Sequence, residues 1–241
     1  INKKAASSKG WLKYYEFVFK KANVICMSNI LSNDVKLIYA GKPFIIPYGV
    51  NPTNYIDIEI EPLSKPIILY LSNLYIKKGV FDFIKIIKKL KETSQNIEAW
   101  IVGNSTSDLS VEELITLIKK EGLMDTVKVL GPKYGEEKEK IFKSASIFIF
   151  PTYWPNEAFP NVILEALEAG LPVISTKEGC LADQIKQGEN GFLLPHNEYD
   201  GIDKKVSMLL FDKQLYKKVS VNNKITFQTN YTLSIFENNL L

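Results

Sequence analysis

Short runs of apolar residues alternate with amphipathic segments along most of this chain, beginning at Pro66. The apolar runs have the length of buried strands and occupy residues 67–72, 97–103, 127–131, 147–152, 172–176 and 191–195. Segments with helical spacing lie at 78–92, 111–122, 136–145, 161–170 and 181–188, and further helical segments continue to the C-terminus. This alternation predicts βαβ units, and hence an α/β fold: a Rossmann-like, doubly wound parallel sheet covered by helices on both faces.

The chain before Pro66 follows another pattern. Apolar residues at helical spacing predict a helix from Trp11, and two short apolar runs predict strands at 23–28 and 44–52. Residues 51–66 contain three prolines and several acids, which favours a linker between two structural units. The predicted divisions are therefore 1–50, 51–66, 67–225 and a C-terminal helix at 226–241. Because residue 1 is Ile and the first eleven residues show no cap or apolar period, we expect a chain cut from something longer.

Composition narrows the class of protein. The 241 residues carry 30 basic and 27 acidic side chains, a net charge of +3, with lysines spread over helix faces. This balance argues against a dedicated nucleic-acid binder, which would show a strong basic excess. The two cysteines, Cys26 and Cys180, lie far apart and favour a reducing, cytoplasmic setting over a disulfide-linked secreted protein. No apolar run approaches the roughly 20 residues needed to cross a bilayer, and no signal peptide is visible.

The loops that follow the strands are the places to look for chemistry, because ligands of open α/β sheets bind beyond the carboxyl ends of the strands. The loop at 72–79 brings Lys77 and Lys78 to the start of a helix, where backbone N–H groups and lysines together suit an anion. An exposed lysine without a ligand is the alternative. The loop at 131–135 suits either a simple turn or a rigid loop that meets a flat ring. Neither a dinucleotide fingerprint nor a P-loop is present.

The loop at 151–161 carries the strongest signal. Pro160 suits the first position of a helix, which places Asn161 in the first turn and Glu165 on the same face in the second. Glu157 precedes the helix, so both carboxylates can face one cavity at the helix N-terminus. Carboxylates accept hydrogen bonds from hydroxyls, and the helix N-terminus suits a diphosphate, so a nucleotide sugar satisfies every part. The alternative is a solvent-exposed loop acid and a polar position on a helix.

The stretch NEAFPNVILEALEAGLPVIST resembles the E-x7-E signature of the family-4 glycosyltransferases, with Glu157 and Glu165 as its two glutamates. KEGCLADQIKQGENGFLLP resembles the end of the same family pattern. IILYLSNLYIKKGVFDFI is similar to its first donor-domain strand and loop, and FIIPYGVN to its interdomain segment. AWIVG and VKVLGPKYGEEKEKIFKSASIFIFPT follow in family order. The resemblance covers roughly residues 12–240.

The resemblance implies a GT-B enzyme with two Rossmann-like domains. Residues 67–225 would bind the donor, a UDP- or GDP-sugar, and residues 1–50 would be the tail of the acceptor domain. It further implies a retaining transfer of a sugar to an acceptor hydroxyl of a glycan or lipid-linked molecule, without cofactor or metal. The implied catalytic residues are Glu157, for hydroxyls of the donor sugar, and Lys78, for the diphosphate.

The remaining donor-binding residues follow from the same resemblance. Glu165 would contact the ribose, the amides around Phe159 and Asn161 would approach the donor, and Gly131 to Lys133 would lie near the base. Asn73 belongs to the donor-binding set but stands where the family usually has an arginine, so one cation for the diphosphate is missing. Lys77 is a candidate to compensate for it. Pro160, Asn161 and Cys180 also depart from the family pattern.

Two other classes of function share these features. One is a non-catalytic nucleotide-sugar-binding fragment or subunit, and the other is a GT-B sugar-nucleotide epimerase. The aromatic residues and lysines at 11–21 suit peripheral contact with the inner face of a membrane or a packed helix, and we favour packing. His196 has no partner in the sequence and is expected to be an ordinary surface residue.

Overall fold

The structure is a computed structural model that describes residues 8–53, 65–93, 96–155 and 157–241. The chain forms two compact units: a smaller unit of Ile1–Asn51 with Thr229–Leu241, and a larger unit of Pro52–Gln228. Most of the predicted linker, residues 54–64, lies outside the described residues.

The larger unit is built on a six-stranded sheet whose order is β5-β4-β3-β6-β7-β8. The strands are β3 Ile67–Leu71, β4 Glu98–Val102, β5 Val127–Gly131, β6 Ile147–Phe150, β7 Val173–Thr176 and β8 Gly191–Leu194. Every neighbouring pair in this sheet is parallel. The order runs outward from β3 in one direction and from β6 in the other, which is the doubly wound arrangement, so the predicted α/β fold is confirmed.

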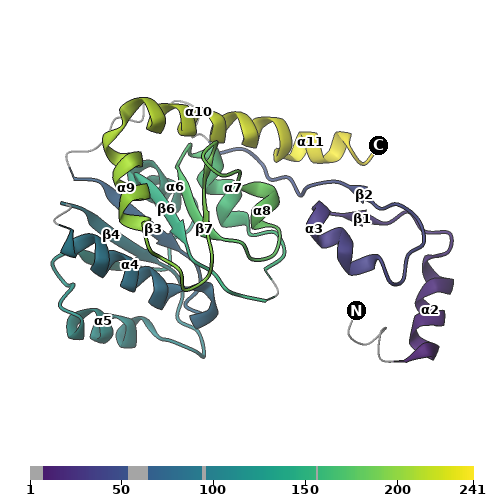
Figure 1. Ribbon diagram of the computed structural model, residues 1–241, viewed down its shortest axis with the longest axis horizontal. Helices are drawn as coiled ribbons and strands as arrows, with labels where there is room; N and C mark the ends of the chain where they lie inside the picture. The colour runs from purple at the N-terminus through teal and green to yellow at the C-terminus, as the bar shows by residue number, and fades with distance from the viewer. Residues whose placement is uncertain (1–7, 54–64, 94–95, 156) are drawn as a thin grey trace. The chain divides into compact units, whose positions relative to one another are not determined.

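Helices cover both faces of this sheet (Figure 1). They are α4 Val80–Glu92, α5 Val111–Lys120, α6 Gly135–Ser144, α7 Asn161–Glu168, α8 Leu181–Gln184, α9 Ile202–Phe211 and α10 Lys213–Asn230, and the short 3₁₀ helix η2 Ile76–Lys78 precedes α4. Every residue of β6 and β7 is buried, as expected for strands covered on both sides. The core of the larger unit therefore lies in two layers, one on each face of the sheet.

Local sequence explains why these helices form where they do. In α4, Val80, Phe83, Ile87 and Leu90 recur at helical spacing and are all fully buried. Burial of each such side chain contributes about 1.5–3 kcal/mol. The hydroxyl of Ser110 accepts a hydrogen bond from the backbone N–H of Glu113, while the Glu113 carboxylate accepts one from the N–H of Ser110, a capping box that starts α5.

The smaller unit contains α2 Lys9–Phe19, β1 Ile25–Cys26, α3 Asn29–Ser32, η1 Asn33–Val35, β2 Phe44–Ile45 and α11 Leu233–Asn238. Strands β1 and β2 pair in parallel. The N–H of Val50 donates to the carbonyl oxygen of Tyr231 at 2.9 Å, and the N–H of Leu233 donates back to Val50 at 2.8 Å. These two hydrogen bonds tie the C-terminal residues to the end of the N-terminal stretch.

Helix α2 has no buried residue, and Trp11, Tyr14 and Phe17 are each more than half exposed. The packing expected for this helix is therefore not observed among the described residues. The rings of Trp11 and Tyr15 stack on each other instead, with centroids 5.9 Å apart. Within the described part of the chain, no helix is long and apolar enough to span a membrane.

Candidate functional site

The loops after β3 and β6 meet at the point where the strand order reverses. The backbone N–H of Tyr153 donates to the carbonyl oxygen of Lys77 at 2.9 Å, which joins the two loops directly. Gly79, between η2 and α4, has φ +87°, and a Cβ there would overlap the carbonyl oxygen of Pro151. Only glycine permits both this backbone conformation and this approach. The close approach of the two loops thus restricts the backbone positions of the residues that flank Gly79 and Pro151.

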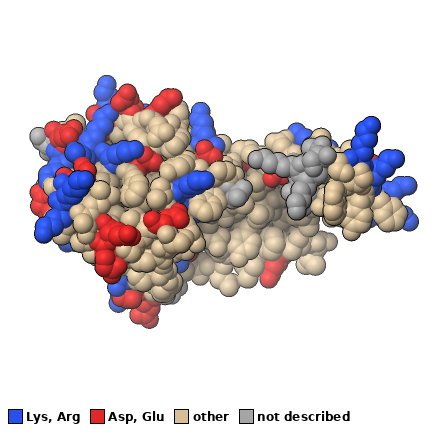
Figure 2. Space-filling model, turned by 90° about the horizontal axis from the view of Figure 1, so that it is seen from below, with Lys and Arg blue, Asp and Glu red and all other residues tan. Residues whose placement is uncertain are grey.

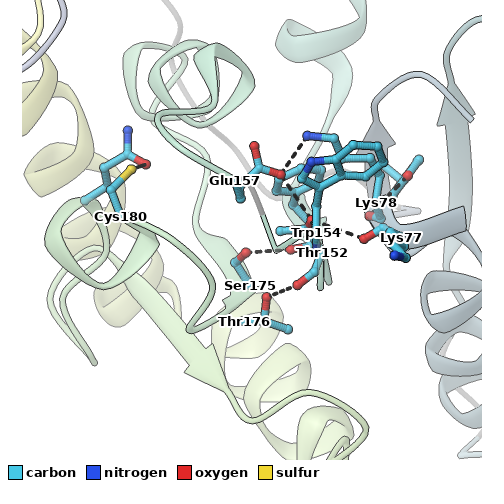
Figure 3. A network of polar contacts seen from close by, with 11 residues as sticks. Lys77, Lys78, Thr152, Trp154, Glu157, Ser175, Thr176 and Cys180 are labelled. Atoms are coloured by element: carbon cyan, nitrogen blue, oxygen red, sulfur yellow. Dashed lines mark hydrogen bonds and ion pairs between the residues drawn. The ribbon is translucent and has the colours of Figure 1, made fainter. Parts of the chain in front are cut away.

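Lys78 and Glu157 form an ion pair at this crossing, with Lys78 Nζ 2.7 Å from Glu157 Oε2 (Figure 3). Glu157 is 6% exposed, so its charge needs a partner. The hydroxyl of Thr152 lies 3.1 Å from the same carboxylate oxygen. Lys78 Nζ also lies 5.4 Å from the ring centroid of Trp154, within the range of a cation–π contact. The two predicted catalytic residues therefore contact each other.

Residues from β7 and from the loop after it contact the backbone of the segment that carries Glu157. The hydroxyl of Thr176 donates to the carbonyl oxygen of Thr152, and that of Ser175 donates to the carbonyl oxygen of Phe150 at 2.5 Å (Figure 3). Gly179 has φ +51°, and a Cβ there would overlap the carbonyl oxygen of Glu157. These contacts hold the backbone at Glu157 and in the residues that precede it. None of them was predicted from the sequence.

Glu165 forms a second ion pair of the same kind. Its Oε1 atom lies 2.7 Å from Lys138 Nζ on α6, and both side chains are partly buried, with 22% and 28% exposed. Among the described residues, no hydrogen bond is made to the second oxygen of Glu165, nor to that of Glu157. Each glutamate thus has one oxygen held by a lysine and one oxygen open as an acceptor. Lys138 was not among the predicted site residues.

The start of α7 lies between these two glutamates in the sequence. Pro160 is the N-cap, in an extended conformation, and Asn161 is the first helical residue, so Pro160 stands one position earlier than predicted. The first N–H groups of a helix have no acceptor within the helix, which makes them available to an anion. Phe159, beside Pro160, is half-buried. The placement of Asn161 in the first turn and Glu165 in the second is confirmed.

The remaining predicted donor-binding residues, Asn73 and the base-binding stretch from Gly131 to Lys133, lie on neighbouring loops. The side-chain oxygen of Asn73, after β3, accepts a hydrogen bond from the side-chain amide of Asn104, after β4, at 3.2 Å. The same amide also donates to the hydroxyl of Tyr134, after β5, at 2.6 Å. Gly131, at the end of β5, has φ +65° and accepts from the N–H of Gly103 at 3.1 Å. Hydrogen bonds between polar side chains therefore link the three loops that follow β3, β4 and β5.

Lys133 differs from this group. Its Nζ atom pairs at 2.8 Å with Glu137, four residues further along and 65% exposed. The structure therefore brings Asn73 to the neighbouring loops, whereas Lys133 contacts the adjacent helix α6 through Glu137.

His196 is not the ordinary surface residue expected from the sequence. It is half-buried, and its ring stacks on Tyr153 with centroids 4.2 Å apart. Its Nε2 atom lies 3.7 Å from Asp82 Oδ2, and Asp82 is buried in the first turn of α4. Because Tyr153 follows Thr152 directly, this cluster packs beside the loop that carries Glu157.

The cations that pair with Glu157 and Glu165 are lysines, and the sequence contains no arginine. On the face that Figure 2 shows, lysines and acidic side chains lie among one another over the larger unit.

Burial raises the pKa of the Cys180 thiol to about 12, so this cysteine is not a nucleophile at neutral pH. Among the described residues, no group of three or more His, Cys, Asp and Glu side chains is placed to hold a metal ion. The expectation of a metal-free reaction stays a prediction.

The fold is that of the GT-B glycosyltransferases. A glycosyltransferase structure from Rickettsia africae superposes with a TM-score of 0.83 over 97% of this chain and 66% of that chain, at 23% identity. HepE of Anabaena, solved in complex with UDP, superposes with a TM-score of 0.80 over 97% of this chain and 66% of its own, at 20% identity. At these identities the likeness establishes the fold.

The sequence model described as "Glycosyl transferases group 1" matches residues 53–226, and the chain belongs to this family. The resemblance seen in the sequence motifs is thereby confirmed.

Relatives in the family include the capsular polysaccharide biosynthesis glycosyltransferase CapM of Staphylococcus aureus, 24% identical over 70% of this chain and 43% of its own length. The amylovoran biosynthesis glycosyltransferase AmsK of Erwinia amylovora is 30% identical over 68% of this chain and 42% of its own length. This chain thus spans less than half the length of either protein.

Proposed function

We propose that the larger unit binds the donor of a glycosyltransferase that builds a polysaccharide or related glycan, and that this donor is a nucleoside-diphosphate sugar. The observation that carries the proposal is the pair of glutamates at the reversal of strand order. Glu157 and Glu165 flank the N-terminus of α7, and each is paired at 2.7 Å with a lysine from another element. A ligand with hydroxyls at both ends and a diphosphate between them matches this order of groups.

The diphosphate would take the place between the two carboxylates. Lys78 Nζ has three N–H groups, of which one is used by Glu157, so two remain for phosphate oxygens. The free N–H groups at the start of α7 add further donors. With no arginine in the chain, the ligand's charge is met by point charges and backbone dipoles rather than by a bidentate guanidinium. Carboxylates repel phosphates but accept hydrogen bonds from hydroxyls, so both glutamates are proposed to bind hydroxyls. The resemblance to the family implies the sugar for Glu157 and the ribose for Glu165.

The chemistry that these groups support is transfer of the sugar with retention of its anomeric configuration. The bond between the anomeric carbon and the diphosphate oxygen breaks, and its electron pair leaves with the diphosphate. An acceptor hydroxyl forms the new bond to the same carbon and gives its proton to the departing phosphate oxygen. Lys78 stabilises the charge that develops on this oxygen, and Glu157 holds the sugar in place.

The relatives support the same substrate class. HepE has been solved with UDP and with UDP-glucose. CapM and AmsK carry names that refer to capsular polysaccharide and amylovoran. The proposed acceptor is accordingly a hydroxyl on a growing glycan, free or linked to a lipid.

Binding is the appropriate test, because this chain spans less than half the length of CapM or AmsK. Titration calorimetry with UDP, GDP and their glucose conjugates at millimolar concentration is expected to give saturable heat with one base. Adenosine diphosphate serves as the comparison for non-specific binding of anions. If neither the uridine nor the guanosine compounds bind more tightly than adenosine diphosphate, the proposal is wrong.

A further inference from the structure

Lys138 has no role in the sequence motifs, yet it makes one of the two ion pairs at the site. It lies on α6, 27 positions before Glu165, and its Nζ atom is 2.7 Å from Glu165 Oε1. Both side chains are partly buried, at 28% and 22% exposed, so the contact is less screened by water than the surface pairs of this protein. Helix α6 thereby determines where a side chain of α7 points.

The geometry around Glu165 explains what this contact does. The carboxylate belongs to the second turn of α7 and would otherwise sample several rotamers. With Oε1 held by Lys138, the second oxygen is the one left to accept, and no other hydrogen bond to it is made among the described residues. A carboxylate that is already oriented toward the ribose hydroxyls loses less conformational entropy when the nucleotide binds than one that is free to rotate.

The neighbouring lysines do not duplicate this arrangement. Lys133 pairs with Glu137, which is 65% exposed, and Lys140 is exposed on the same helix as Lys138. Lys78 is committed to the other glutamate, Glu157. Among the described residues, Lys138 is thus the one lysine with an ion pair to Glu165.

We propose that Lys138 is a positioning residue for the donor, which orients Glu165 through their ion pair and so sets the discrimination for ribose hydroxyls. This inference rests on the proposed function, since it assumes a nucleotide at the site. Lys138 acts through Glu165 and need not touch the ligand. Its effect should therefore appear in the preference for the ribose form of the nucleotide and should depend on the presence of the glutamate.

The experiment measures two dissociation constants by calorimetry, one for the diphosphate that the wild-type chain binds (UDP or GDP) and one for its 2′-deoxy analogue. The wild-type chain is expected to prefer the ribose form by about tenfold or more, as a site built to bind a hydroxyl does. Lys138→Met is expected to weaken binding of the ribose form by about tenfold, the usual loss for a hydrogen bond to a charged group. It should leave the deoxy form nearly unchanged, so that the preference disappears. Lys138→Arg should retain most of the preference.

Glu165→Gln and the double variant Lys138→Met/Glu165→Gln decide whether Lys138 acts through Glu165. In the Glu165→Gln background, Lys138→Met is expected to have no further effect, because coupled residues are not additive. Lys140→Met is the matched control, because Lys140 is an exposed lysine on the same helix as Lys138, and it should bind both nucleotides as wild type does. Thermal melting of each variant verifies that it is folded. The 3′-deoxy analogue is titrated alongside, so that a contact to either hydroxyl is detected.

The possible failures are distinguishable. If wild-type protein binds neither UDP nor GDP, the proposed function falls, and this inference falls with it. If wild-type protein binds one of them but folded Lys138→Met keeps the full ribose preference, only the role of Lys138 is wrong. Additive effects of Lys138→Met and Glu165→Gln would likewise overturn it, since they would mean independent contacts.

Discussion

Lys78 Nζ and Glu157 Oε2 lie 2.7 Å apart, although the two residues are separated by 79 positions and come from loops that follow different strands. Glu157 is almost fully buried, whereas Lys78 keeps about a fifth of its side chain exposed. The carboxylate therefore depends on the lysine for its charge balance, while the lysine still reaches solvent. A group that neutralises a buried acid and faces outward is positioned to meet an incoming anion.

Removal of this lysine should destabilise the fold. In Lys78→Met the Glu157 carboxylate is left buried without its cation, and we expect the free energy of unfolding to fall by about 1–3 kcal/mol, less than for a fully buried pair because Lys78 is partly exposed. Urea denaturation measures the change. Lys88→Met removes the lysine of a solvent-exposed pair with Glu121 and should lower the free energy of unfolding by clearly less. Equal losses in the two variants would show that the Lys78–Glu157 pair is an ordinary surface contact.

Gly179 should be essential to the site although it bears no side chain. Gly179→Ala places a Cβ against the carbonyl oxygen of Glu157 and strains a left-handed backbone, so Glu157 must move. We expect binding of a UDP- or GDP-sugar to fall by about tenfold or more. Gly188→Ala is the matched control, because Gly188 has φ +75° but open space around it. It should cost roughly 1 kcal/mol of stability and leave binding intact; if the two variants bind equally, the close approach is unimportant.

Glu168 should make the stability of the larger unit depend on pH. Burial raises the pKa of this carboxyl from an ordinary 4.5 to about 7, even though it accepts a hydrogen bond from the N–H of Thr53. The folded state thus binds a proton that the unfolded state has released. The resulting stabilisation is complete below pH 4.5 and is lost as the pH rises through about 7, a change of about 1–3 kcal/mol.

Glu168→Gln isolates this effect, since glutamine stays neutral and still offers an acceptor to Thr53. The variant is expected to unfold at higher urea concentration than wild type at pH 8 and at a similar concentration at pH 4.5. Glu121→Gln, at an exposed acid whose pKa is lowered by Lys88, should show no gain at pH 8. A constant difference between Glu168→Gln and wild type across this range would contradict the assignment.

The sheet and most of its helices were predictable from the sequence because buried parallel strands and amphipathic helices each leave a regular apolar pattern. The position of Glu157 and Glu165 followed from the same pattern, since the loop at 151–161 had to lie at the carboxyl edge of the sheet. The predicted helix 161–170 starts at Asn161, as α7 does, but Pro160 is the N-cap rather than the first helical residue. A proline suits both the N-cap and the first helical position, and the sequence does not separate the two.

The supporting contacts of the site could not be predicted in the same way. Lys138 lies on a helix whose lysines look alike in sequence, and only the packing of α6 beside α7 selects it. Ser175 and Thr176 belong to a buried strand, where their hydroxyls donate to carbonyl oxygens of β6 and of the loop that follows it. His196 lacks a partner in sequence but meets Tyr153 through the fold. Each depends on the tertiary arrangement, which a linear pattern does not contain.

The central claim is that the two glutamates bind opposite ends of one donor. The most direct measurement is calorimetry of UDP and UDP-glucose, or of the guanosine pair, with wild type, Glu157→Gln and Glu165→Gln. Glu157→Gln should weaken the nucleotide sugar while leaving the free nucleotide almost unchanged, whereas Glu165→Gln should weaken both by about tenfold. Unchanged binding of both ligands by both folded variants, or equal losses for both ligands in both variants, would contradict the account.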